Sequence, residues 1–277
     1  MPRRIKLILE YDGTEFHGWQ AQPRQAGAPP ARTVQGELER ALRELTGLAV
    51  PVAGASRTDA GVHALGQVAS FDLADPVRVP TARLAEALNG RLPADVSILE
   101  AAEAPPDFHA RFSARGKEYC YSILEKRTRE PLWRRTHWQV RWPLDTRAMQ
   151  QAAGALVGEH DFAAFAAELA AREGLRPEPA QRGSSTVRQV RRIEVAAAPP
   201  ARLGRAEPAK DAREIRIHVE GSGFLYKMVR AIAGSLVEVG RGARPPEWLR
   251  EVLASRDRRR AGPTAPPQGL CLVHVIY

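Results

Sequence analysis

In the N-terminal part of the chain, the spacing of apolar residues differs between two segments. Residues 5–11 place them at every second position and end at Asp12-Gly13, which predicts a strand. Residues 33–47 place them three or four positions apart and end at a glycine, which predicts a helix. The segments that follow are predicted as strand, strand, helix and strand, at 50–56, 66–73, 81–90 and 95–103. The order β-α-β-β-α-β is that of the split βαβ or ferredoxin-like fold, in which helices cover one face of an antiparallel sheet.

A similar succession returns in the second half of the chain. Predicted strands lie at 117–125, 186–197, 213–221 and 270–277, and predicted helices at 145–158, 224–240 and 246–255. We therefore expect an α+β protein of two tandem ferredoxin-like or RRM-like units with antiparallel sheets, divided at Pro105-Pro106 into residues 1–104 and 105–277. Stretches rich in Pro, Gly and Ala are expected to be surface loops, at 21–32, 171–185 and 198–212. Because this fold supports many activities, it does not identify the function.

Composition narrows the class of protein. The 277 residues suffice for one large domain or two ordinary ones, and they contain no apolar run long enough to span a membrane. The N-terminal stretch does not have the pattern of a signal peptide. Cys120 and Cys271 are far apart and lack the spacing of zinc ligands, so we expect neither a metal site nor a disulfide. A reducing, cytoplasmic location fits these features.

The charge of the chain favours a polyanionic partner. Its 41 Lys and Arg against 32 Asp and Glu leave a net charge of +9, and contacts between such cations and phosphates release condensed counterions. Most of the cations are arginine, which suits phosphate binding and stacking on bases. The same bias is also typical of a GC-rich genome or a hot habitat. Charge alone therefore leaves nucleic-acid binding open.

One carboxylate stands apart from all others. In GASRTDAGVHALGQ (54–67), Asp59 follows Arg57 by two positions, and the nearest other acids are Glu44 and Asp72. Thr-Asp-Ala-Gly is often only a turn. In an extended segment, however, Arg57 and Asp59 share a face, and the arginine favours the charged carboxylate. A single charged acid suits work at a sugar carbon, whereas a glycosidase requires a second carboxylate. These residues favour a nucleoside substrate, whose base is its own leaving group.

Basic and aromatic residues alternate in residues 109–125. They are Arg111, Phe112, Arg115, Lys117, Tyr119 and Tyr121. In a strand, Tyr119 and Tyr121 face the same side. There they form either a structural aromatic pair or, beside arginines, a surface on which an extruded base stacks. The mixture continues at 126–142 with three tryptophans, where a surface hairpin is the alternative to direct base contact.

The predicted helix at 224–240 carries a cation on the border of its buried face. The apolar stripe consists of Leu225, Val229, Ile232 and Leu236. Arg230 flanks this stripe, and a half-buried cation requires an anion, for which Asp59 is a candidate. His63 has no second His or Cys at ligand spacing, and we interpret it as a structural hydrogen-bonding residue rather than a metal ligand.

Six stretches of the chain carry a resemblance to a known family. They are EYDGTEFHGWQAQ (10–22), TVQGELERAL (33–42), GASRTDAGVHALGQVASF (54–71), DFHARFSARGKEYCY (107–121), FLYKMVRAIAGSLVEVG (224–240) and TAPPQGLCLVHV (264–275). Together they resemble the tRNA pseudouridine synthase A family from about residue 5 to residue 277, and RTDAGVHA is highly specific in this setting. The three inserts depart from the family pattern and, apart from residues 21–22, lie outside these motifs.

The resemblance implies a cofactor-free isomerase that converts uridine to pseudouridine at positions 38, 39 and 40 in the anticodon stem-loop of tRNAs. It also implies a homodimer without metal or membrane association, with each active site in a basic cleft between the halves of a subunit. Asp59 matches the essential aspartate, and Tyr119 matches the tyrosine that packs on the target base. Arg230 matches the basic partner of the aspartate, and Arg57 matches the arginine that helps bring the nucleotide out of the stack.

That reaction accounts for a lone acid. It breaks the N1–C1′ bond, turns the uracil and joins C5 to C1′. The reaction therefore requires neither an attacking water nor a second carboxylate. Whether Asp59 attacks C1′ or removes the 2′ proton is left open by the sequence. Two alternatives remain: a non-catalytic RNA-binding protein with two RRM-like units, which would need an aromatic RNP1 pattern, and a nucleoside hydrolase, which would need a second acid.

Overall fold

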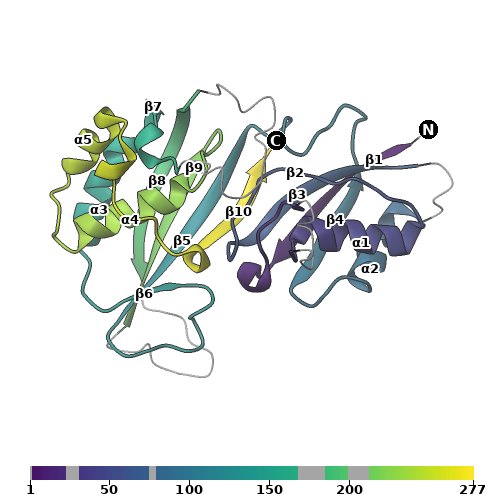
Figure 1. The fold of residues 1–277 in the computed structure, drawn as a ribbon, viewed down its shortest axis with the longest axis horizontal. Helices are drawn as coiled ribbons and strands as arrows, with labels where there is room; N and C mark the ends of the chain where they lie inside the picture. Colours follow the sequence, from purple (N-terminus) through teal and green to yellow (C-terminus); the bar gives the residue numbers. More distant parts are fainter. Residues whose placement is uncertain (1, 23–30, 75–78, 168–184, 199–211) are drawn as a thin grey trace. The chain divides into compact units, whose positions relative to one another are not determined.

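The computed structural model describes residues 2–22, 31–74, 79–167, 185–198 and 212–277 (Figure 1). The chain forms two compact units, Met1–Lys117 together with Cys271–Tyr277, and Glu118–Leu270. Both units contain helices and strands, which confirms the α+β class. The expected division between residues 104 and 105 stays a prediction. Most of the three expected inserts lies outside the described residues.

In the first unit the strand order is β4-β1-β3-β10, and β2 pairs with β3. The elements are β1 (Arg3–Tyr11), α1 (Val34–Thr46), β2 (Ala53–Gly54), β3 (His63–Leu73), α2 (Thr81–Asn89), β4 (Val96–Glu103) and β10 (Leu270–Ile276), with a 3-10 turn at Gly13–Glu15. β1 runs antiparallel to both β3 and β4. Ile5, Leu7 and Leu9 are completely buried, as their alternation predicts. Both helices were also predicted, and α1 contacts α2 while α2 contacts β4 (Figure 1).

Two expectations for this sheet were wrong. The strand expected at 50–56 is reduced to Ala53–Gly54. The Ala55 N–H still donates to the Val68 carbonyl at 2.8 Å, but the Ser56 N–H donates to the Gln67 side chain instead of a backbone carbonyl, and the loop that carries Asp59 follows. The sheet is also not purely antiparallel, since β10 runs parallel to β3, with Cys271 opposite His63. Most of the closing strand, from Cys271 onward, belongs to the first unit. Its partner is distant in sequence, so no hairpin turn sets its direction.

The second unit has the strand order β5-β9-β8-β7, with β6 beside β5. Its elements are β5 (Gly116–Lys126), β6 (Trp138–Val140), α3 (Thr146–Ala153), β7 (Gly158–Asp161), β8 (Val187–Ala198), β9 (Ala212–Gly221), α4 (Met228–Gly240) and α5 (Trp248–Ser255). Short 3-10 turns lie at Gly154–Leu156, Ala163–Phe165, Arg258–Arg260 and Pro267–Gly269. β8 and β9 form the expected antiparallel pair, whereas β6 runs parallel to β5. On β9, Ile215, Ile217 and Val219 are completely buried at alternate positions.

Helix α4 differs from its prediction in two ways. It begins at Met228 rather than near residue 224, because Lys227 has a φ of 58° and cannot continue a right-handed helix. It is also buried around most of its circumference instead of along one stripe. The chain at Pro263 passes so close to Gly234 that a Cβ there would clash with the Pro263 carbonyl. A segment distant in sequence thus covers a face of the helix that lies outside the predicted apolar stripe.

Candidate functional site

The loop that carries Asp59 lies between β2 and β3 in the first unit. Its burial alternates: Ser56 and Thr58 are buried, Arg57 is exposed and Asp59 is half-buried. This alternation is typical of an extended stretch, in which every second side chain faces the same way. The stretch ends in a turn, where the Val62 N–H donates to the Asp59 carbonyl at 3.1 Å.

A buried glutamine fixes the start of this loop. The Gln67 carboxamide accepts a hydrogen bond from the Ser56 N–H at 3.1 Å and donates to the Ser56 carbonyl at 2.8 Å. The Tyr11 hydroxyl lies 2.8 Å from the Thr58 hydroxyl. Gln67 is completely buried and Tyr11 is 4% exposed. Because a buried polar group that loses its partner is costly, this network fixes the Ser56 backbone and the Thr58 side chain, on either side of Arg57.

Residues 16–19 hold the loop from another direction. The Trp19 N–H donates to the Thr58 carbonyl at 3.1 Å, and the Gly61 N–H donates to the Phe16 carbonyl at 3.3 Å. Gly18 has a φ of +94°, and a Cβ built on it would lie 2.6 Å from the Thr58 oxygen. The two motifs EYDGTEFHGWQ and GASRTDAG therefore form a single structure. Its backbone is fixed while the Asp59 side chain stays partly accessible.

His63 has the structural role that its sequence context predicts. Its Nδ1 accepts a hydrogen bond from the Gly13 N–H at 3.0 Å, and the side chain is buried. This contact ties the start of β3 to the turn after β1. Across the described ranges, we find no group of three or more His, Cys, Asp or Glu side chains arranged to hold a metal ion.

Two of the predicted site residues, Tyr119 and Arg230, lie in the second unit. Tyr119 is on β5 and is 5% exposed. Its ring meets Phe224 edge-on, with 5.4 Å between ring centroids and an interplanar angle of 88°. Tyr121 is completely buried and meets Trp138 edge-on at 6.3 Å. Each tyrosine thus has its own aromatic neighbour on a different element.

Tyr121 has a structural role. Its hydroxyl donates to the Pro266 carbonyl at 2.8 Å, and burial raises the pKa of this phenol, so it remains protonated. A Cβ on Gly269 would also meet the Tyr121 ring at 2.6 Å. The assignment of Tyr119 to base packing stays a prediction.

Arg230 is half-buried on α4, which confirms its predicted place on the border of the buried face. Its Nε donates to the Ala265 carbonyl at 2.8 Å, and the Ala265 N–H donates to the Arg230 carbonyl at 3.0 Å. These two hydrogen bonds hold the Arg230 backbone and its Nε against the segment that precedes β10. The proposed partner, Asp59, belongs to the other unit, and their pairing stays a prediction.

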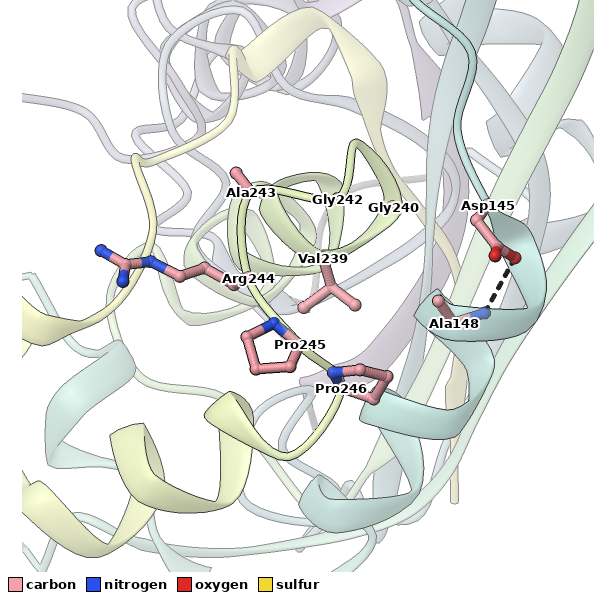
Figure 2. Close-up of a pocket in the computed structure, with 9 residues that line it drawn as sticks. All are labelled: Asp145, Ala148, Val239, Gly240, Gly242, Ala243, Arg244, Pro245 and Pro246. Carbon is pink, nitrogen blue, oxygen red and sulfur yellow. Dashed lines mark hydrogen bonds between the residues drawn. The ribbon is translucent and has the colours of Figure 1, made fainter.

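The second unit also contains a hollow of about 430 Å³ at the C-terminal end of α4 (Figure 2). Gly240, Pro245 and Pro246 line it, together with Asp145. The Asp145 carboxylate is already used as the N-cap of α3, where it accepts hydrogen bonds from two backbone N–H groups. None of the predicted site residues lines this hollow, and beside Asp145 its only charged lining residue is Arg244. It is not the candidate active site.

The residues that hold the Asp59 loop were not singled out by the sequence analysis. Gln67 offered one signal, since it is a polar residue close to the apolar residues Ala64, Leu65, Val68 and Ala69, and such residues are buried only when their hydrogen bonds are made. Tyr11 and Gly18 offered none, because their contacts depend on pairing between segments distant in sequence.

Comparison with known proteins identifies the class. A family described as "tRNA pseudouridine synthase" matches residues 7–113 and 152–277. The tRNA pseudouridine synthase A of Myxococcus xanthus is 47% identical over 278 residues, which cover 100% of this chain and 92% of that protein. The proteins of the same name from Syntrophotalea carbinolica and Moorella thermoacetica are 44% and 43% identical, over 99% of this chain and 96% and 99% of their own lengths.

The chain belongs to the tRNA pseudouridine synthase A family. The expected resemblance and the expected class of enzyme, an isomerase, are thereby confirmed. Among the helices that the structure describes, none has the length and apolar character needed to cross a membrane.

Proposed function

We propose that this protein isomerises uridine to pseudouridine at positions 38, 39 and 40 of the tRNA anticodon stem-loop, without a cofactor and with Asp59 as its essential catalytic group. Family membership supports the reaction, and the names of its relatives support tRNA as the substrate. The observation that carries the assignment of Asp59 is the fixed backbone of its loop. Hydrogen bonds from Gln67 and Trp19 hold the residues before it, while the side chain itself is only half-buried.

A fixed loop suits the chemistry. The carboxylate has to meet one atom of the ribose, and a preorganised group avoids the cost of reorganising during the reaction. Asp59 acts at the sugar, either as a nucleophile at C1′ or as the base for the 2′ hydrogen. The uracil leaves through N1, turns and rejoins through C5, and the C5 proton is then lost. Bulk water has to be kept out, because a hydrolysed glycosidic bond would release uracil.

The other site residues have supporting roles in this proposal. Tyr119 packs on the target base, Arg230 pairs with the Asp59 carboxylate and Arg57 helps bring the nucleotide out of the stack. The exposed position of Arg57 on the Asp59 loop fits this role. We further propose two tandem ferredoxin-like units with a basic active-site cleft between them, assembled as a homodimer in the cytoplasm. The net charge of +9 fits a polyanionic substrate.

The test is conversion of unmodified tRNA by the purified protein. Uridines that become reactive with carbodiimide at positions 38–40, with no change in RNA mass and no free uracil, would support the proposal. Release of uracil would identify a hydrolase instead. Binding of tRNA without any conversion would identify a non-catalytic RNA-binding protein.

A further inference from the structure

A short turn in the first unit, His109–Ser113, carries a cationic side chain and an aromatic side chain. Hydrogen bonds within the turn fix its conformation. The His109 Nδ1 accepts hydrogen bonds from the N–H groups of Arg111 and Phe112, at 3.1 and 3.3 Å. The Ser113 N–H donates to the His109 carbonyl at 2.9 Å, and the His109 N–H donates to the Ser113 hydroxyl at 3.0 Å. These four bonds close the turn on itself.

The turn is also anchored to the sheet through one residue. The Ala110 N–H donates to the Ser70 hydroxyl of β3 at 3.0 Å, and the Ala110 carbonyl accepts a hydrogen bond from the Tyr277 hydroxyl at 2.6 Å. Ala110 and Ser70 are buried. Anchored in this way, the turn holds its outward side chains in place before any partner arrives, which lowers the entropic cost of binding.

Phe112 is placed for stacking rather than for the core. Its ring is 71% exposed, whereas the phenylalanines of the core are at most 3% exposed. The His109 ring packs on it at 4.4 Å between centroids, and the Arg111 guanidinium lies 5.6 Å from its centroid. An exposed aromatic ring supported on one side and flanked by a cation is a surface on which nucleic-acid bases stack.

Lys117 is a second cation, near enough to Arg111 for the two positive charges to interact. It is half-buried on β5, and within the described residues its ammonium forms no hydrogen bond or ion pair with a carboxylate. Burial first, and the positive charge of Arg111 second, lower the pKa of Lys117 to about 8. A half-buried cation with a second positive charge nearby is unfavourable by itself and is stabilised when an anion binds beside it.

We propose that Arg111, Phe112 and Lys117 form a binding site for one RNA nucleotide, distinct from the uridine that is isomerised. Lys117 and Arg111 bind its phosphate, and its base stacks on Phe112. This inference rests on the proposed function for the identity of the RNA as tRNA. Charge complementarity favours RNA over a protein partner, since both polar groups are cations and the apolar group is a lone, flat ring.

The test is binding of fluorescently labelled, unmodified tRNA to the full chain over a range of KCl concentrations. Lys117→Met removes the charge and keeps the length of the side chain, and Phe112→Ala removes the ring. Phe112→Trp restores a stacking surface. Arg83→Met and Leu99→Ala are matched controls, because they remove an exposed cation and a half-exposed apolar side chain elsewhere in the first unit.

We expect Lys117→Met to reduce the slope of log Kd against log salt by about 0.7 to 0.9, the loss of one phosphate contact. Phe112→Ala should weaken binding by about five- to a hundredfold with an unchanged slope, and Phe112→Trp should restore the affinity. Neither control should change slope or affinity by more than about twofold. A purely structural role would instead lower the melting temperature of Lys117→Met, whereas removal of an uncompensated cation leaves it unchanged or raises it.

The proposal is overturned if both variants bind tRNA like the wild type, or if their losses match those of the controls. It is also overturned if Phe112→Trp binds no better than Phe112→Ala. Conversion of uridine by the wild type, measured on the same RNA, judges the proposed function separately. Absence of pseudouridine would reject that function, while the binding data would still decide whether this nucleotide site exists.

Discussion

Gly18 faces the Thr58 carbonyl so closely that an added Cβ would lie 2.6 Å from its oxygen. The same Cβ would lie 3.2 Å from the carbonyl carbon of Asp59. The turn before α1 and the loop of the proposed catalytic residue are therefore packed backbone against backbone. Such an approach leaves room for no side chain at residue 18, and it makes the position of Asp59 depend on a residue distant in sequence.

Gly18→Ala should reduce both stability and activity. The substitution forces an alanine to a φ of +94° and pushes it against the Thr58 carbonyl. Gly47→Ala is the matched control, because Gly47 has a φ of +73° and a Cβ there would meet nothing within 4 Å. We expect Gly47→Ala to lower the free energy of unfolding by about 1 kcal/mol and Gly18→Ala by roughly 1–3 kcal/mol more. Urea denaturation and single-turnover assays measure the two effects, and equal behaviour of the two variants would contradict the packing argument.

Asp59→Asn should abolish turnover and largely preserve tRNA binding. The amide is nearly the same size as the carboxylate but cannot attack C1′ or accept the 2′ proton as an anion does. Few phosphate contacts are lost, so the Kd for tRNA should stay within a few-fold of the wild type. Pseudouridine formation by the pure variant at a hundredth of the normal rate would count against the assignment. The melting temperature of the same preparation controls for folding.

Substitutions of Tyr119 separate catalysis from stability. Tyr119→Phe keeps a ring against Phe224 and a face for the base, whereas Tyr119→Ala removes both. Stacking on a base contributes about 1–3 kcal/mol, so alanine should weaken capture of the flipped nucleotide by about ten- to a hundredfold while phenylalanine retains affinity. If the hydroxyl, or a water that it holds, takes part in removing the C5 proton, phenylalanine will bind normally and turn over slowly.

The control for Tyr119 is its stability. Melting temperatures and single-turnover rates are measured on the same two variants, alongside Tyr121→Phe, which removes the buried hydrogen bond to Pro266 without touching the proposed base-packing ring. A loss of rate that follows the loss of stability in all three variants would reject the role of Tyr119 at the base.

The effect of Lys117→Met on stability should depend on pH. The pKa of Lys117 in the folded protein is about 8, below the usual value of 10.5, because burial and Arg111 disfavour the charged form. The folded state therefore binds fewer protons than the unfolded state between these two pH values, and the stability of the wild type rises with pH in this window. Below pH 8 the cost of the buried cation is fully present, and above 10.5 it is absent.

Thermal melts of the wild type and Lys117→Met at pH 7 and pH 10 measure this difference. We expect the variant to gain more stability relative to the wild type at pH 7 than at pH 10. Arg83→Met serves as the control, since it also removes one cation, an exposed guanidinium that pairs with Glu86. A difference between wild type and variant that is the same at both pH values would show that Lys117 titrates normally.

Elements whose apolar residues recur with a regular period are predictable from the sequence alone. β1 and α1 follow from apolar spacings of two and of three to four, and both form where those spacings predict. The isolation of Asp59 and its highly specific motif were likewise visible without a structure. These features are local, so neighbouring residues in the chain contain the information.

Only the tertiary structure decided what lies against those elements. The parallel pairing of β10 with β3 and the close approach of Gly18 to Thr58 each join segments far apart in the chain. The burial of α4 around most of its surface likewise depends on the chain near Pro263. Local periodicity shows which face of an element is apolar, but it does not specify which distant segment covers that face, because pairing and packing partners are selected by contacts that form only in the folded chain.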